Sequence, residues 1–249
     1  MGSWEQITYN IVGGIIVAGL TFPYRWITAL LRSYRFQRIF GPIQENQFFL
    51  VYGLLELGKC LDERGNSVEA PYIKPGVGGA FRISSLVSAA QTRGIKYIAE
   101  MFGKNVRVTP FLVPDNEIRD RMDISYCSIG GKDNLKTNDA LEDDENKFFD
   151  FDTTTNPVTI RVKETGERFC CRNNHDYAFI IKLRPKSLQD RTWVAIAGLG
   201  EWGTSGAAWY LAKNWKAIGS RYKRKSFGLI IRVKAGKDES AELIFQSKK

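Results

Sequence analysis

The chain has few of the residues from which common catalytic and metal sites are built. Its 249 residues include one histidine, His175, and four cysteines that form no C-x-x-C pair. A zinc site of cysteine and histidine ligands would be incomplete at the usual spacings, so we expect no metal site. The Walker A signature, the nucleophile elbow, the H-E-x-x-H motif and the deaminase signature are also missing, and we expect no bound cofactor. The cysteines are interpreted as reduced structural residues: Cys60, Cys127, Cys170 and Cys171.

Length and composition describe an ordinary folded protein with a basic surface. A hydrophobic fraction of 43% and a charged fraction of 25% exclude wholesale disorder. The net charge of +9 indicates a nucleic acid, an anionic membrane surface or a phosphate ligand as partner. Much of it lies in two runs, Arg25, Arg32, Arg35 and Arg38 early in the chain and Lys213, Lys216, Arg221, Lys223, Arg224 and Lys225 late in it.

The N-terminal segment predicts one transmembrane helix. No charged side chain occurs between Gln6 and Tyr24, and apolar residues resume after Arg25. About 20 apolar residues match the ~30 Å hydrocarbon core of a bilayer. A cleaved signal peptide is not favoured, because the first charge is Glu5 and bulky residues follow the apolar core. Membrane helices tolerate glycines, which also allow close helix packing, so a homo-oligomer could form through Gly13, Gly14 and Gly19.

Charge on either side of this segment predicts its orientation. One acidic residue precedes it and arginines follow it, so the positive-inside rule puts the N-terminus outside and the main domain in the cytoplasm. The basic, aromatic stretch Arg32–Arg38 suits anionic lipid. We therefore expect a single-pass protein of the cell membrane, with the anchor and juxtamembrane segment in residues 1–40 and a cytoplasmic domain in residues 41–249.

The rest of the chain alternates short apolar strands with helices. Strands are predicted over residues 48–57, 106–113, 123–129, 177–183, 192–197, 227–233 and 241–245, and helices over 85–102, 134–141 and 204–218. Such alternation is typical of the doubly wound α/β class, a mostly parallel sheet with helices on both faces. The stretches 159–163 and 168–172 predict a β-hairpin insertion, and residues 58–82 predict a long loop or insertion.

Two strand-to-helix junctions are rich in glycine and polar residues. In a doubly wound fold, ligands lie beyond the carboxyl ends of the strands. Glycines there let the backbone approach a phosphate, and a helix N-terminus supplies free N–H groups. The candidate ligand-binding residues are Gly130, Gly131, Lys132, Asn134 and Thr137 in the first junction and Gly198, Gly200, Glu201, Gly203, Thr204 and Ser205 in the second. Three of these glycines form a G-x-G-x-x-G pattern between a strand and a helix, the context that the pattern requires.

Each junction also has a purely structural interpretation, in which the glycines only permit tight turns and close packing. A standard dinucleotide site is not favoured, because no acidic residue ends a following strand about twenty residues on. Glu201 would be unfavourable beside a phosphate; it can contact ribose hydroxyls, act as a catalytic acid or face solvent. His175 is either a surface-loop residue or a general base paired with Asp176.

A family resemblance rests on these two junctions. The stretch Gly198–Ala208, with its Gly-x-x-Gly-Thr step at Gly200–Thr204, resembles the second glycine motif of SLOG/LOG-type Rossmann-like domains. The GG-x-x-N-x-x-T run at Gly130–Thr137 resembles a motif of uncharacterised Rossmann-like domains, including some archaeal surface-layer proteins. The first resemblance implies a Rossmann-like sheet and either nucleotide processing or sensing of nucleotide-derived signals in bacterial antiviral systems. The catalytic glutamate usual in LOG-type enzymes is replaced by Ala208, which favours the sensor.

Together these features predict a membrane-anchored sensor or effector that binds a nucleotide-type, phosphate-bearing ligand, within prokaryotic antiviral signalling as the resemblance implies. The alternative is a membrane-tethered nucleotide or NAD-type hydrolase, for which no catalytic residue is identified. Nucleic acid is not an expected partner, because no recognised motif is present. The feature that favours nucleic-acid binding is a set of aromatic residues among the late lysines, on which bases could stack: Tyr210, Trp215 and Tyr222.

Overall fold

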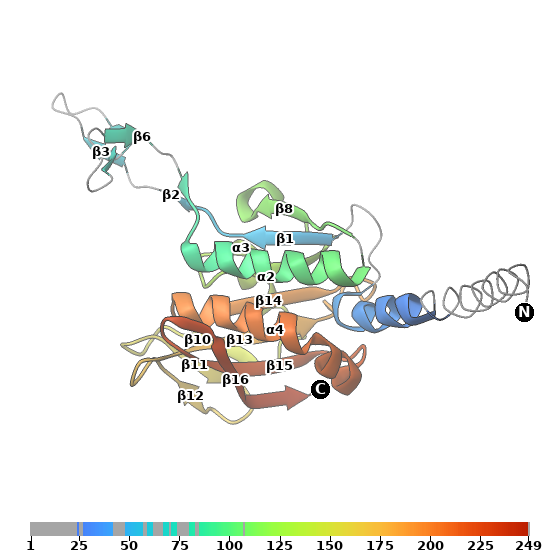
Figure 1. Cartoon of the computed structure of the whole chain (residues 1–249). Coiled ribbons are helices and arrows are strands. Elements are labelled where there is room, and N and C mark those ends of the chain that lie inside the picture. The colour runs from blue at the N-terminus through green and yellow to red at the C-terminus, as the bar shows by residue number, and fades with distance from the viewer. Residues whose placement is uncertain are drawn as a thin grey trace, which may run out of the picture.

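A seven-stranded sheet forms the centre of the molecule (Figure 1). The computed structural model describes residues 24, 27–41, 48–56, 59–61, 67–69, 71–73, 80–82, 85–106 and 108–248. The strands lie in the order β16-β15-β13-β14-β9-β1-β8. They span β1 Phe48–Tyr52, β8 Phe111–Pro114, β9 Ser125–Ile129, β13 His175–Leu183, β14 Trp193–Gly198, β15 Phe227–Lys234 and β16 Lys237–Lys248.

Five of the seven strands point the same way. Strands β8, β1, β9 and β14 pair in parallel, whereas β13 is antiparallel to both β14 and β15, and β16 is antiparallel to β15. The predicted α/β class with a mostly parallel sheet is confirmed. The central strands β9 and β14 are buried along their whole length, as near-continuous apolar runs require when both faces of a sheet are covered.

Helices cover one face, and a mixed layer covers the other. The first face packs against α2 (Ala89–Val106), α4 (Glu201–Tyr222) and a helix of residues 27–40, and their side chains share one apolar core with the sheet. The second core lies between the sheet and η1 (Asp115–Ile118), α3 (Leu135–Glu142) and a three-stranded sheet. That small sheet consists of β10 (Phe149–Asp152), β11 (Thr159–Val162) and β12 (Arg168–Phe169).

The predicted hairpin and the predicted long insertion both contain strands. The predicted hairpin is the antiparallel pair β11–β12, which β10 extends by a third strand. Short antiparallel ladders lie in the insertion between β1 and α2, away from the main sheet in Figure 1. They pair β2 (Leu55–Glu56) with β7 (Ser85–Leu86), β3 (Lys59–Leu61) with β4 (Ser67–Glu69), and β5 (Pro71–Ile73) with β6 (Ala80–Arg82).

The predicted transmembrane helix lies almost entirely outside the described residues, which include only Tyr24 of its uncharged run. Among the helices of the described residues, none has the length and apolar character that crossing a membrane requires. The segment after it is not a free juxtamembrane tail. Phe36, Ile39 and Phe40 are fully buried in the core beneath α2 and α4. The predicted domain boundary at residue 41 therefore falls after a helix that packs as part of the α/β domain.

Candidate functional site

The two glycine junctions meet at one edge of the sheet. Strands β9 and β14 are parallel neighbours, so their carboxyl ends emerge side by side. A methyl group built on Gly131 would lie 3.6 Å from the carbonyl oxygen of Gly198, which places the two loops in direct contact. A cavity of about 380 Å³ opens there. It is lined by Ser88, Ala90, Gln91, Gly130, Gly131, Lys132, Asp133, Phe151, Thr153, Val158, Gly198, Leu199, Gly200, Glu201 and Thr204.

Seven of the eleven predicted ligand-binding residues line this cavity, and four do not. Those that line it are Gly130, Gly131, Lys132, Gly198, Gly200, Glu201 and Thr204. The four others are Asn134, Thr137, Gly203 and Ser205, and each makes contacts within the protein. The Ser205 hydroxyl, for example, accepts a hydrogen bond from Arg93 and contacts Asp238, which itself pairs with Arg93.

Asn134 caps helix α3 and holds the ends of two strands. Its Oδ1 accepts the backbone N–H groups of Lys136 and Thr137, at 3.0 and 3.2 Å, and its Nδ2 donates to the carbonyl oxygens of Val51 and Ile129. Thr137 is equally buried, and its hydroxyl donates to Ser128 at 3.0 Å. Neither side chain is available to a ligand, so both belong to the support of the cavity.

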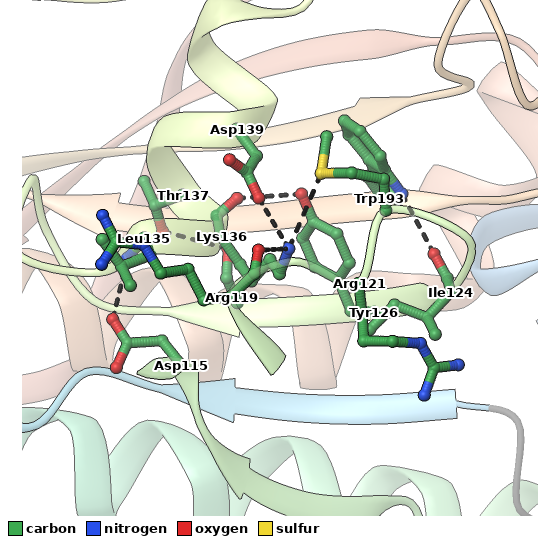
Figure 2. Close-up of polar contacts among 12 residues, drawn as sticks. Asp115, Arg119, Arg121, Ile124, Tyr126, Leu135, Lys136, Thr137, Asp139 and Trp193 are labelled. Atoms are coloured by element: carbon green, nitrogen blue, oxygen red, sulfur yellow. Dashed lines mark hydrogen bonds and ion pairs between the residues drawn. The ribbon is translucent and has the colours of Figure 1, made fainter. Parts of the chain in front are cut away.

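The start of α3 is held by further buried polar groups that sequence analysis did not single out (Figure 2). Asp115 Oδ2 accepts the backbone N–H of Leu135 at 2.8 Å. The fully buried Lys136 Nζ contacts the carbonyl oxygen of Arg119 at 2.9 Å and Asp139 at 2.8 Å. With Asn134 taking the next two amides, the first three N–H groups of α3 are all occupied. This helix N-terminus is therefore not the free phosphate site that we expected.

The N-terminus of α4 is partly filled by Asp176. Its buried carboxylate accepts the backbone N–H of Gly203 at 2.7 Å and that of Tyr177 at 2.7 Å. Gly200 must be small here, because a methyl group on it would lie 2.6 Å from Asp176 Oδ2. The protein thus supplies its own anion to this helix end, which removes part of the positive potential expected for a phosphate.

The same carboxylate is not paired with His175, as the general-base interpretation requires. The Nδ1 atom of His175 contacts the carbonyl oxygen of Asn173 at 3.0 Å, whereas Asp176 accepts from Cys171 Sγ at 3.2 Å. Burial, and then the charge of Asp176, raises the pKa of the Cys171 thiol to about 12. Cys171 is therefore a neutral thiol at physiological pH and not an activated nucleophile.

Close packing explains part of the glycine pattern. A methyl group on Gly198 would lie 2.4 Å from the backbone nitrogen of Thr204, and one on Gly203 would lie 2.7 Å from the carbonyl oxygen of Tyr177. The Gly198 N–H donates to the Thr204 hydroxyl at 3.1 Å, which closes the turn into α4. The structural interpretation of the second junction therefore holds for these two glycines.

Several polar groups of the cavity remain open to a ligand. Within the described part of the chain, the backbone N–H groups of Gly131, Lys132 and Gly200 have no acceptor. Gln91 is only 3% exposed, and its Oε1 is buried without a hydrogen-bond partner among the described residues. Its Nε2 donates to Asp133 at 3.3 Å, which fixes the orientation of the amide.

The charged lining is mixed. Lys132, Asp133 and Glu201 are exposed at the cavity, so one cation faces two carboxylates. A polyphosphate would be repelled by this set, whereas a ligand with one anionic group and several hydrogen-bond donors would match it. Sequence analysis missed Gln91 and Asp133. Asp133 lies inside the first glycine motif, but Gln91 comes from α2 and only the fold brings it here.

Comparison with protein-family models, with curated proteins and with solved structures finds no match to this chain. Fold and site therefore define its class directly: it is an α/β protein with an open cavity where two parallel strands end.

Proposed function

We propose that this chain is a membrane-anchored sensor whose α/β domain binds a nucleotide-type ligand with a single phosphate group. The observation that carries the proposal is that both glycine junctions line one cavity at the carboxyl ends of β9 and β14. This is the position at which open parallel sheets hold ligands. A volume of about 380 Å³ suits a mononucleotide-sized molecule. The apolar N-terminal segment would hold the protein in the cell membrane with this domain in the cytoplasm.

The phosphate is assigned to the lysine side of the cavity. Lys132 supplies the positive charge, and the unpaired backbone N–H groups of Gly131, Lys132 and Gly200 supply donors. A nest of backbone amides beside one lysine is sufficient for a single phosphate. The carboxylates of Asp133 and Glu201 then limit how much negative charge the ligand can carry.

The sugar is assigned to the acceptor side. Gln91 Oε1, Asp133 and Glu201 are all hydrogen-bond acceptors, and ribose hydroxyls are donors that would satisfy them. The buried Oε1 of Gln91 is the most discriminating of the three, because an unpaired buried acceptor costs about 1–3 kcal/mol. A ligand that donates to it recovers this free energy, and a ligand that lacks the donor does not.

Calorimetry on the full chain in detergent tests the site. We expect adenosine 5′-monophosphate or ribose 5-phosphate to bind and to raise the melting temperature. Lys132→Gln should weaken binding by about 1–3 kcal/mol, because it removes a charge-assisted contact. Lys147→Gln is the matched control, since Lys147 is also an exposed loop lysine but does not line the cavity. Absence of binding by every phosphate-bearing compound would sink the proposal.

A second variant tests the assignment of the sugar. Gln91→Met keeps the length of the side chain and removes the acceptor. The wild type should prefer ribose 5-phosphate to 2-deoxyribose 5-phosphate, and Gln91→Met should lose that preference while still binding both. Equal affinity of the wild type for the two sugars would reject the role of Gln91 and leave the phosphate assignment intact.

A hydrolase is the second candidate, favoured by the exposed carboxylate of Glu201 at the cavity. Such a group can act as an acid or a base toward a bound nucleotide. Incubation of the full chain with nucleotides and NAD, followed by chromatography, would show product that Glu201→Gln abolishes. Binding without turnover supports the sensor instead.

A further inference from the structure

The two basic runs of the sequence come together at the end of the domain opposite the cavity. Phe36 packs against Trp215 with a ring-centroid distance of 5.2 Å, so helix 27–40 crosses the C-terminal half of α4. Lys182 on β13 donates to the carbonyl oxygens of both Arg38 and Lys223 and joins the two runs directly. Figure 1 shows helix 27–40 in blue at the right-hand end of the domain, the end at which β1 starts.

A groove between the two helices collects cations from both runs. It has a volume of about 180 Å³ and is lined by Thr28, Leu31, Arg32, Arg35, Trp215 and Lys216. Within the described residues, Arg32, Arg35 and Lys216 form no ion pair, and the lining contains no carboxylate. Three like charges around one small groove repel one another, and a bound anion would relieve that repulsion.

The helix dipole does not account for this cluster. Basic residues favour the last turn of a helix, and Arg221 occupies that position in α4. Lys216 lies more than one turn earlier, where the effect of the dipole has fallen off. Arg32 and Arg35 lie on helix 27–40 before its last turn. The stabilisation of helix C-termini by positive charge therefore does not explain the three groove cations.

An exposed apolar face lies beside the groove. Its residues are 49–51% exposed and follow helical spacing along helix 27–40: Ile27, Leu30, Leu31 and Tyr34. Phe36, Ile39 and Phe40 point to the opposite side of the same helix and are buried in the core. The exposed face is thus a second apolar stripe that the described residues leave uncovered. Leu31 belongs both to this stripe and to the groove.

We propose that the groove binds the headgroup phosphate of an anionic phospholipid, with the apolar stripe of helix 27–40 against the acyl chains. Charge complementarity favours this partner, because cations and aliphatic side chains alternate on one surface. A nucleic acid would use the cations and leave Ile27, Leu30 and Leu31 in water. The inference goes beyond the proposed function and is independent of any ligand in the cavity.

Lys216 makes the test specific. It lies far from the N-terminal segment in sequence, so lipid binding through that segment alone would not depend on Lys216, whereas binding in the groove would. Native mass spectrometry of the full chain in detergent would measure retention of phosphatidylglycerol and of phosphatidylcholine. We expect preferential retention of phosphatidylglycerol, and about fivefold weaker affinity in Lys216→Gln, as the loss of one cation at an anionic headgroup predicts.

Lys213→Gln is the matched control. Lys213 is also an exposed lysine of α4, but it lines a different pocket together with Glu100 and Tyr97. The control should retain phosphatidylglycerol like the wild type, and all three proteins should melt at the same temperature. Equal retention of both lipids, or an equal loss in Lys213→Gln and Lys216→Gln, would overturn the proposal. Binding of an RNA oligonucleotide that depends on Lys216, without any preference between the lipids, would overturn it in favour of nucleic acid.

Discussion

The two ends of α4 carry charges of opposite sign. At the N-terminal end, the carboxylate of Asp176 binds a free backbone N–H, and Glu201 lies in the first turn. At the C-terminal end, Arg221 occupies the last turn and Lys182 donates to the carbonyl oxygen of Lys223. Both sets match the helix dipole, so the fold itself accounts for them. Lys132 at the cavity and the three cations of the groove are not explained in this way, and these are the cations for which we propose ligands.

The largest expected difference in the free energy of unfolding is between a substitution on the buried side of helix 27–40 and one on its exposed side. Phe36→Ala removes a fully buried ring that contacts Phe40, Phe102 and Trp215. It should lower the free energy of unfolding by about 3–5 kcal/mol. Tyr34→Ala, on the exposed side of the same helix, should change it by less than about 0.5 kcal/mol. Denaturant unfolding of the two variants measures the difference, and similar losses would mean that the helix is not part of the domain core.

At the cavity end, Gly198→Ala should destabilise the junction. Its methyl group would approach the backbone nitrogen of Thr204, which cannot move without opening the turn. Overpacking of this kind costs about 1–3 kcal/mol. Gly103→Ala is the control, because nothing lies within 4 Å of its methyl position and an alanine suits a helix. Thermal unfolding should show opposite signs for the two, and no loss in Gly198→Ala would remove the packing explanation for that glycine.

Substitutions of Asp176 test whether its carboxylate stabilises the start of α4. Asp176→Ala leaves the backbone N–H groups of Gly203 and Tyr177 without their acceptor and should cost about 1–3 kcal/mol of stability. Asp176→Asn keeps an acceptor and should lose less. Chemical unfolding ranks the three proteins. If both variants are as stable as the wild type, the carboxylate is not what holds the start of α4.

The smallest effect is a dependence of stability on pH at the basic end. Burial, and then the charges of Arg184 and Arg224, lowers the pKa of Lys182 from 10.5 to about 7. Above pH 7 the folded protein releases a proton that the unfolded chain retains, so stability should rise with pH. The slope should be roughly 1 kcal/mol per pH unit between about pH 7.5 and 9. Lys182→Met should flatten it, and an unchanged slope in that variant would assign the effect to another group.

Local patterns in the chain predicted most of the elements but not their partners. Apolar runs located β9, β13, β14 and β15 to within a few residues, because strands buried on both faces leave a continuous signal. The antiparallel placement of β13 carries no such signal. Strand direction depends on which neighbour a strand meets, and that contact is not local. The helix predicted over residues 85–102 spans Ala89–Val106 instead, and the Oγ of Ser88 accepts the N–H of Gln91 at 3.2 Å before its first turn.

For the candidate site, sequence alone determined the two glycine junctions and their placement between strands and helices. Backbone conformation at a tight turn is a local property, and glycine at such positions is visible without a structure. Only the tertiary structure decided which side chains remain free for a ligand. In the structure, Asn134 accepts backbone N–H groups at the start of α3 and the Thr137 hydroxyl donates to Ser128. Asp176 lies at the start of α4, and Gln91 lines the cavity. The sequence likewise shows the positive charge of each basic run. The two runs meet in one groove only because helix 27–40 packs against α4, a contact between residues about 180 positions apart.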